Sequence, residues 1–177
     1  MGWLPQESFL ARGSRRCSLS GLCVLMGAVA HIQPSVLVVE DNADDVCLFK
    51  AALRRVASSI AFQFVGDGEE AIAYLKGEAP FSDRRAHPFP ELVLLDLTLP
   101  KVDGFTVLEW IRTTPGCENL KVFVWSGWRT ASYAERLKKL GADRFILKAA
   151  GVEGLADVVT AIGTALKEKA TESGTVV

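Results

Sequence analysis

Short runs of consecutive apolar residues recur along the chain, and between them apolar residues are spaced three or four positions apart. The runs have the length of buried strands, whereas the spaced segments have the period of helices that pack on one face. We predict five strands from these runs, at residues 36–39, 62–65, 92–95, 122–125 and 144–147. A helix is predicted after each strand, the first of them from the spacing of Val46, Phe49 and Leu53.

The predicted strands are largely apolar throughout rather than alternating between apolar and polar positions. That pattern is typical of a parallel sheet with helices on both faces. Strict alternation of strand and helix, joined by right-handed crossovers, then predicts a doubly wound α/β fold. We predict one domain over residues 34–168, preceded by an extension over residues 1–33 and followed by a tail over residues 169–177.

Polar and charged residues follow four of the five predicted strands. They are Glu40 and Asp41 after the first strand, Asp96 and Thr98 after the third, Ser126 after the fourth and Lys148 after the fifth. Doubly wound sheets bind ligands outside the carboxyl ends of their strands, which share one edge of the sheet. We therefore expect these residues to converge on one rim and to form the functional site.

Three carboxylates close together repel one another unless a cation lies between them, and Mg²⁺ prefers oxygen ligands. The rim therefore predicts a Mg²⁺ site with Asp41 and Asp96 as ligands and the backbone carbonyl of Thr98 as a further ligand. Glu40 and Asp41 are adjacent at the end of a strand, where side chains alternate between the two faces. We accordingly expect Asp41 to bind the ion directly and Glu40 to act through water.

Asp96 is the predicted nucleophile, because it is central among the rim residues and a carboxylate can attack phosphorus. Phosphoryl transfer mainly requires in-line positioning and neutralisation of the phosphoryl oxygens. Lys148 would supply a positive charge to those oxygens, and the hydroxyl of Ser126 would donate a hydrogen bond. Each residue alone also has an ordinary explanation as a helix cap, a turn residue or a solvated charge. Their joint occurrence at four strand ends favours the site.

The overall charge of the chain is nearly balanced. It carries 20 basic and 21 acidic residues, which gives a formal net charge of −1. This balance does not favour a nucleic acid or a membrane surface as partner, so we predict a protein partner. The 4 cysteines lack the close pairs of a zinc site. We interpret them as unpaired thiols of a cytoplasmic protein.

The N-terminal region has the order of a secretory signal peptide. Arg12, Arg15 and Arg16 precede an apolar run over residues 19–30. The run is interrupted by serine and glycine and is short for a membrane span. We favour a non-structural extension, or a start at Met26, and export is the alternative.

Three segments of the chain resemble the receiver domains of bacterial response regulators. They are VLVVEDN at residues 36–42, LVLLDLTLPKVDG at residues 92–104 and FILK at residues 145–148. The resemblance covers residues 35–167 and implies a flavodoxin-like (βα)5 sheet with the strand order 2-1-3-4-5. The segment AYLKG at residues 73–77, with the long loop after it, is similar to regulators that partner bacterial phytochrome-type sensor kinases.

The resemblance also implies a role for each rim residue. In that family the residues matching Asp41 and Asp96 hold the metal, and the residue at Asp96 is phosphorylated by a histidine kinase or a phosphotransfer protein. Ser126 and Lys148 then read the phosphoryl group, and Phe145 matches the aromatic residue that moves inward on activation. Such a protein catalyses only its own phosphorylation and dephosphorylation. The fourth helix, fifth strand and fifth helix would form the contact face for a partner or a second copy.

Two features depart from the family. Ala149 stands where a proline after a cis peptide bond is usual, and a cis bond before alanine costs about 3–4 kcal/mol. Trp125 and Trp128 flank Ser126 where smaller residues are usual, and the bulk of Trp128 predicts a long-lived phosphoryl group. These departures motivate an alternative function, a receiver-like scaffold that binds its partner without phosphorylation. A phosphatase of the haloacid-dehalogenase type is disfavoured, since its second acid would stand at Thr98.

Overall fold

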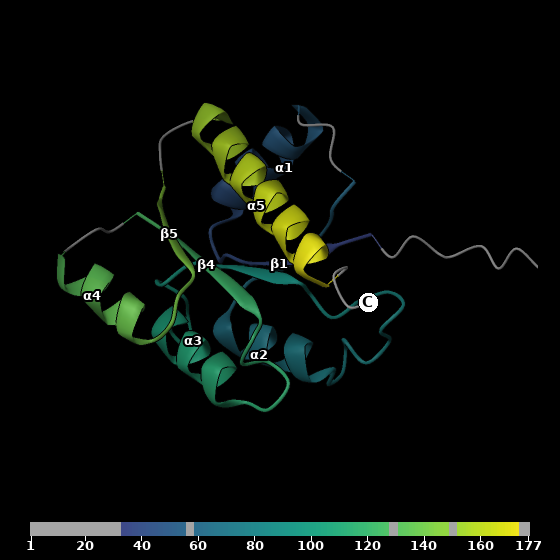
Figure 1. The fold of residues 1–177 in the computed structure, drawn as a ribbon, viewed down its shortest axis with the longest axis vertical. Coiled ribbons are helices and arrows are strands. Elements are labelled where there is room, and N and C mark those ends of the chain that lie inside the picture. Colours follow the sequence, from purple (N-terminus) through teal and green to yellow (C-terminus); the bar gives the residue numbers. More distant parts are fainter. Residues whose placement is uncertain (1–32, 56–58, 128–130, 149–151, 174–177) are drawn as a thin grey trace, which may run out of the picture. The chain divides into compact units, whose positions relative to one another are not determined.

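Five parallel strands form one sheet in the order β2-β1-β3-β4-β5, and a helix follows each strand (Figure 1). The computed structural model describes residues 33–55, 59–127, 131–148 and 152–173. The strands are β1 (Ser35–Val39), β2 (Ala61–Val65), β3 (Leu92–Leu95), β4 (Lys121–Ser126) and β5 (Arg144–Leu147). The helices are α1 (Ala43–Arg55), α2 (Gly68–Lys76), α3 (Gly104–Thr113), α4 (Ala131–Lys139) and α5 (Val152–Ser173). The predicted strands, their order and the doubly wound fold are confirmed.

Successive residues of the inner strands point to opposite faces of the sheet. Val36 and Val38 of β1 pack into one buried cluster, while Leu37 and Val39 pack into another. Both faces are covered by helices, so every residue of β1 is buried. This double burial explains why the inner strands are apolar throughout.

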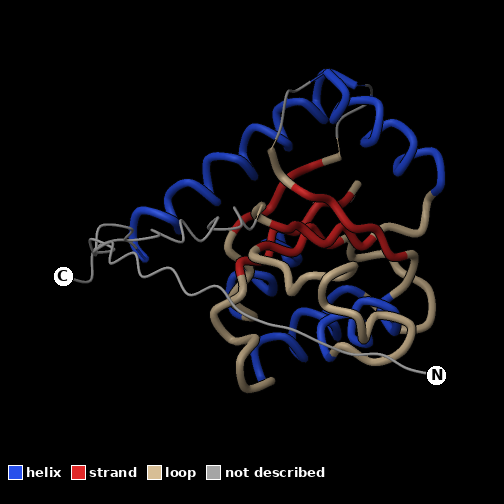
Figure 2. The backbone as a smooth tube through the Cα atoms, turned by 90° about the vertical axis from the view of Figure 1, so that its right-hand side faces the viewer, coloured by secondary structure: helices blue, strands red, loops and turns tan. Residues whose placement is uncertain are grey.

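Two layers of helices enclose the sheet (Figures 1 and 2). α1 and α5 cover one face, where Phe49 and Ile162 are fully buried against the strands. α2 and α3 cover the other face, where Tyr74 and Ile111 are buried. α4 lies on the same side as α2 and α3, beside β5 (Figure 1).

The β5 edge of the sheet is partly exposed to solvent. The side chain of Leu147 at the end of β5 is 45% exposed. Among the described side chains of α4, Leu137 alone is buried. The predicted contact face is therefore open to solvent along α4 and β5.

A long loop over residues 77–90 joins α2 to β3 and is fastened by Arg84. Its guanidinium donates to the backbone carbonyls of Tyr74 and Leu75 at the end of α2, at 2.8 Å each. The phenol of Tyr74 donates in turn to the carbonyl of Pro88 at 2.9 Å. The loop is therefore packed onto the domain rather than projecting from it.

α5 extends past residue 168, where the sequence analysis ends the domain, and continues to Ser173. The ammonium of Lys169 donates to the carbonyl of Glu91 at 3.4 Å and so connects these last turns to the start of β3. The predicted tail over residues 169–177 therefore begins as helix.

Several predictions concern positions outside the described residues. They are the N-terminal extension with its apolar run, the peptide bond before Ala149 and the shielding role of Trp128. Within the part of the chain that the structure describes, no helix is long and apolar enough to cross a membrane. Of the cysteines in that part, Cys47 is exposed, Cys117 is buried, and both are free thiols.

Candidate functional site

The hydrogen-bond ladder of the sheet continues beyond the strands to the residues of the rim. The amide of Glu40 donates to the last carbonyl of β2 at 3.0 Å, and that of Asp96 to the last carbonyl of β1 at 3.1 Å. The amide of Lys148 donates to the carbonyl of Ser126 at 3.0 Å. These bonds place the four residues in register at one edge of the sheet, as the sequence predicts.

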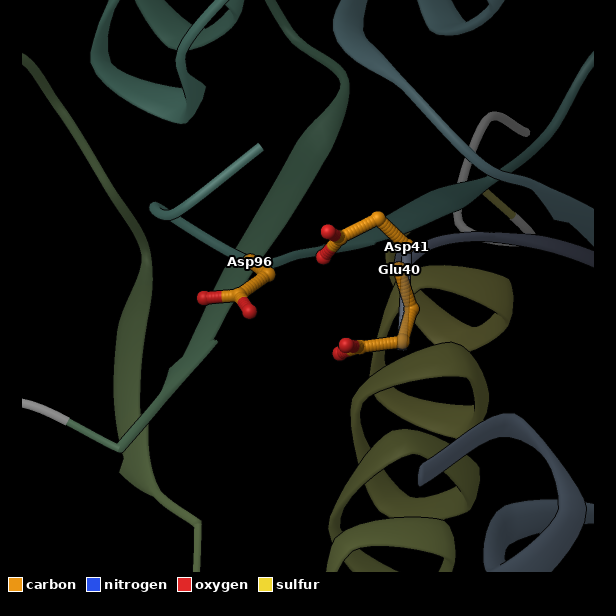
Figure 3. A group of neighbouring side chains, drawn as sticks. All are labelled: Glu40, Asp41 and Asp96. Atoms are coloured by element: carbon orange, nitrogen blue, oxygen red, sulfur yellow. The ribbon is translucent and has the colours of Figure 1, made fainter. Parts of the chain in front are cut away.

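Three carboxylates converge at this edge, from Glu40, Asp41 and Asp96 (Figure 3). Each offers one oxygen, and these oxygens lie within 4.8 Å of one another. Glu40 and Asp96 are buried, whereas Asp41 is exposed. The side chains of Glu40 and Asp41 leave the end of β1 in opposite directions, and both carboxylates then reach towards Asp96 (Figure 3).

The chemistry of this donor set fits a hard divalent cation, which prefers carboxylate and other oxygen ligands. Glu40, Asp41 and Asp96 are the residues that could hold it. Thr98 is exposed and lines a cavity that also contains these three acids. Direct binding by Asp41, action of Glu40 through water and binding by the carbonyl of Thr98 stay predictions.

Lys148 lies among the carboxylates. Its ammonium is 2.6 Å from a carboxylate oxygen of Glu40 and 2.8 Å from one of Asp96. A third oxygen, from Asp45, lies at 2.9 Å. Burial alone would lower the pKa of Lys148, but hydrogen bonds to the three carboxylates outweigh it and raise the pKa above its ordinary value. Lys148 is therefore a permanent cation in a group of acids.

Asp45 is a site residue that the sequence analysis did not identify. It lies in the first turn of α1, immediately after the strand end that carries Glu40 and Asp41. The side chain of Asn42 caps this helix by accepting the amide of Asp44 at 2.9 Å. The signal available in the sequence was a second acid, after Asp44, in the first turn of the helix that leaves the rim.

The carboxylate of Asp96 is held from two sides. One oxygen accepts the backbone amides of Leu97 at 2.6 Å and Thr98 at 3.2 Å. The other oxygen accepts the ammonium of Lys148 at 2.8 Å. The orientation of this carboxylate is therefore set by the chain that follows β3 and by the end of β5.

The hydroxyl of Ser126 is a buried polar group that has no hydrogen-bond partner among the described residues. It faces a cavity of about 260 Å³ that opens at the rim. The cavity is lined by Glu40, Asp41, Asn42, Asp45, Asp96, Thr98, Ser126, Gly127 and Lys148. A buried hydroxyl without a partner is destabilising by about 1–3 kcal/mol unless a ligand satisfies it. Ser126 is therefore suited to donate to a group that enters this cavity.

Phe145 lies one strand away from the cavity. It pairs with Val124 in the register of β4 and β5 and is half-buried against the core on the side of α2 and α3. The structure thus brings Ser126 and Phe145 onto neighbouring strands. Their coupled movement on activation stays a prediction.

The carboxyl of Glu40 has a raised pKa. Its side chain is enclosed, and burial raises the pKa of the carboxyl to about 7 from 4.5, although Lys148 opposes this shift. Between these two pH values the folded state binds more protons than the unfolded chain. Without metal, the free energy of unfolding should therefore fall as the pH rises through this window.

We expect the substitution Glu40→Gln to remove this pH dependence, by up to about 3 kcal/mol across the window. The measurement is the urea unfolding midpoint of both proteins from pH 4 to pH 8, in the presence of a chelator. All other titrating groups are common to both proteins, so the difference between the curves reports Glu40. Parallel curves would show that the carboxyl titrates normally.

Comparison with known proteins identifies relatives of this chain. A family model described as the response regulator receiver domain matches residues 36–160. The chain is 34% identical over 89 residues to the response regulator Rcp1 of Synechocystis, a match that covers 50% of this chain and 58% of Rcp1. It is also 34% identical over 89 residues to the probable methanogenesis regulatory protein FilR2 of Methanothrix harundinacea, covering 50% of this chain and 55% of FilR2. The chain thus spans a little over half the length of these two relatives.

Two solved structures are similar in fold and sequence. The phosphorylated cyanobacterial phytochrome response regulator RcpA has a TM-score of 0.66 and 32% identity, covering 73% of this chain and 91% of that chain. The Mn²⁺-bound form of Rcp1 has a TM-score of 0.64 and 26% identity, covering 81% of this chain and 97% of that chain. These neighbours confirm the predicted resemblance to phytochrome-associated regulators. One of them binds a divalent cation, with which the acid cluster of this chain is compatible.

Proposed function

Because this chain belongs to the response regulator receiver domain family, we propose that Asp96 accepts a phosphoryl group from a histidine kinase or a phosphotransfer protein. Mg²⁺ would be held by Glu40, Asp41 and Asp96 during this reaction. The phosphorylated chain would signal by a change of conformation. It would catalyse its own phosphorylation and dephosphorylation and no other reaction.

The observation that carries this proposal is the environment of the Asp96 carboxylate. Backbone amides and Lys148 orient its two oxygens. The buried hydroxyl of Ser126 lines the same cavity without a partner among the described residues. An oriented nucleophile, a cation and an unused donor are the groups that phosphoryl transfer requires.

In the proposed reaction an oxygen of Asp96 forms the bond to phosphorus while the bond from phosphorus to the donor breaks. Mg²⁺, when bound, supplies positive charge to the phosphoryl oxygens. The ammonium of Lys148 would transfer its contact from the carboxylate of Asp96 to a phosphoryl oxygen. The hydroxyl of Ser126 would donate to another phosphoryl oxygen and so gain the partner that it lacks.

The signal is proposed to leave through the face formed by α4, β5 and α5. Ser126 ends β4, and Phe145 lies on the adjacent strand beneath this face. Leu147 is exposed on it, as a contact for a protein partner or a second copy requires. Phosphorylation would shift the population between two arrangements of the face. If phosphorylation changed no NMR chemical shifts of residues in α4 and β5, that result would contradict this route.

The direct test is incubation of the protein with acetyl phosphate and Mg²⁺, followed by intact mass measurement. A gain of one phosphoryl group, located on Asp96 by peptide mapping, is the expected result. The absence of any gain would favour the alternative function, a scaffold that binds its partner without phosphorylation. A mass gain at another residue would reject Asp96 as the acceptor.

We expect Asp41→Asn to weaken Mg²⁺ binding by at least about tenfold. Removing a group that only supports a metal ligand already weakens metal binding by about tenfold to a hundredfold, and Asp41 is a predicted ligand. The amide keeps the shape of the side chain but removes one negative charge from the cluster. Mg²⁺ affinity can be measured as stabilisation against thermal unfolding across a Mg²⁺ titration. The matched control is Asp44→Asn, because Asp44 is an exposed acid close by that is outside the cluster. Equal affinities for the two variants would reject Asp41 as a ligand.

A further inference from the structure

The ammonium of Lys148 lies over the face of a buried indole. Its nitrogen is 4.7 Å from the centroid of the Trp125 ring, and Trp125 is only 3% exposed. A cation over an aromatic face at this distance is attracted by the ring, most strongly where water is excluded. The side chain of Lys148 is itself 16% exposed, so little water competes for the contact.

The indole is held in place by other aromatic rings. The ring of Phe49, on α1, packs against Trp125 with the centroids 5.7 Å apart. Phe49 also contacts Phe62 and Phe64 of β2 edge-on. This row of rings belongs to the core between the sheet and α1. Trp125 therefore presents a rigid surface to the lysine.

The indole N–H of Trp125 makes no hydrogen bond to a described residue that would account for a tryptophan at this position. It is buried and has no hydrogen-bond partner among the described residues. Buried tryptophan normally finds a partner for this group, so an unsatisfied donor has a cost. The part of Trp125 that makes a polar contact is the face of its ring, and the contact is with Lys148.

α1 supports the lysine in two ways. Asp45 lies four residues before Phe49, so both side chains project from the same side of the helix. The carboxylate of Asp45 is 2.9 Å from the ammonium of Lys148, while Phe49 packs behind Trp125. A single helix face thus contacts the lysine directly and fixes the ring beneath it.

We propose that Trp125 and Asp45 are positioning residues that hold the ammonium of Lys148 at the phosphoryl site, an inference that rests on the proposed function. A lysine side chain is flexible, and Glu40, Asp45 and Asp96 all attract it. The indole limits the ammonium to one height above the sheet, and Asp45 holds it on the side towards α1. Lys148 is then in place before a phosphoryl group arrives.

The test compares Trp125→Phe, which keeps a ring, with Trp125→Leu, which keeps an apolar side chain without a ring. With acetyl phosphate and saturating Mg²⁺, we expect Trp125→Leu to label more slowly by about threefold to thirtyfold, the range of a partly desolvated cation–π contact. Trp125→Phe should restore most of the rate. Urea unfolding of both variants reports whether either change damages the fold.

A second readout is independent of phosphorylation. Protons above the face of an aromatic ring resonate upfield, so the ε-methylene of Lys148 should show an upfield shift in the parent protein by NMR. The shift should be smaller in Trp125→Phe and absent in Trp125→Leu. A parent protein without the shift would overturn the inference, whereas a parent protein that fails to label would overturn the proposed function alone.

Asp45→Asn tests the other half of the arrangement and does not disturb the core. We expect slower labelling by a similar factor, and the control Asp44→Asn should label at the parent rate. This pair also decides the matter if Trp125→Leu unfolds. Labelling of Asp45→Asn at the parent rate would overturn the positioning role of Asp45, and labelling of folded Trp125→Leu at the parent rate would overturn that of Trp125.

Discussion

Asp96→Asn is expected to abolish phosphoryl incorporation, with the rate reduced by at least about a thousandfold, because the substitution removes the nucleophile itself. The fold should survive, since the amide oxygen can still accept the backbone amides of Leu97 and Thr98. The ion pair with Lys148 is lost, but Lys148 keeps Glu40 and Asp45 as partners. Intact mass after incubation with acetyl phosphate and Mg²⁺ measures the result.

The matched control is Asp157→Asn, which makes the same chemical change at an exposed position of α5. This variant should gain one phosphoryl group at the parent rate. Urea unfolding of both variants confirms that the comparison is between folded proteins. Continued labelling of the Asp96→Asn protein at a neighbouring residue would show that another group can serve as acceptor.

Gly104→Ala is expected to lower the free energy of unfolding by about 3 kcal/mol, at the upper end of the usual cost of overpacking. Gly104 is the first residue of α3, and its amide donates to the carbonyl of Leu97 at 3.1 Å. A methyl group added there would overlap the carbonyl oxygen of Asp96 and the Cα of Leu97. Both are backbone atoms, so no side-chain rotation relieves the overlap. Urea unfolding measures the loss.

Because the overlap falls on the backbone of Asp96, the same substitution should also slow phosphoryl incorporation. The control is Gly163→Ala within α5, where the nearest atom to an added methyl group is the Cδ1 of Ile60 at 3.9 Å. That distance is an ordinary contact, so alanine should raise the free energy of unfolding by about 0.5–1 kcal/mol through its higher helix propensity. Equal destabilisation by both substitutions would exclude the close approach of α3 to Asp96 as the cause.

The apolar pattern of the chain was sufficient to predict the strands and the edge that carries the site. Burial between two helix layers requires an uninterrupted apolar run, and the run in β1 is easy to recognise for that reason. The polar residues that follow four of the five runs then identify the carboxyl edge of the sheet. Glu40, Asp96 and Lys148 are all held there by the continuing ladder of the sheet.

Other features of the site depend on which elements meet in space. Asp45 contacts Lys148 although more than a hundred residues separate them, because the start of α1 and the end of β5 both lie at the carboxyl edge of the sheet. The convergence of the carboxylates of Glu40 and Asp41 with that of Asp96 likewise depends on the pairing of β1 with β3. Neither arrangement leaves a periodic signal in the sequence.

The sequence by itself determined the strands, the doubly wound sheet and the residues of its rim, because burial and strand ends are encoded by neighbouring positions. Only the tertiary structure decided that Lys148 lies between three carboxylates and above Trp125, and that the hydroxyl of Ser126 has no partner among the described residues. The physical reason is that charge pairing, ring contacts and hydrogen-bond satisfaction depend on distances between segments remote in the chain. Those distances are set by strand order and by the packing of helices on the sheet.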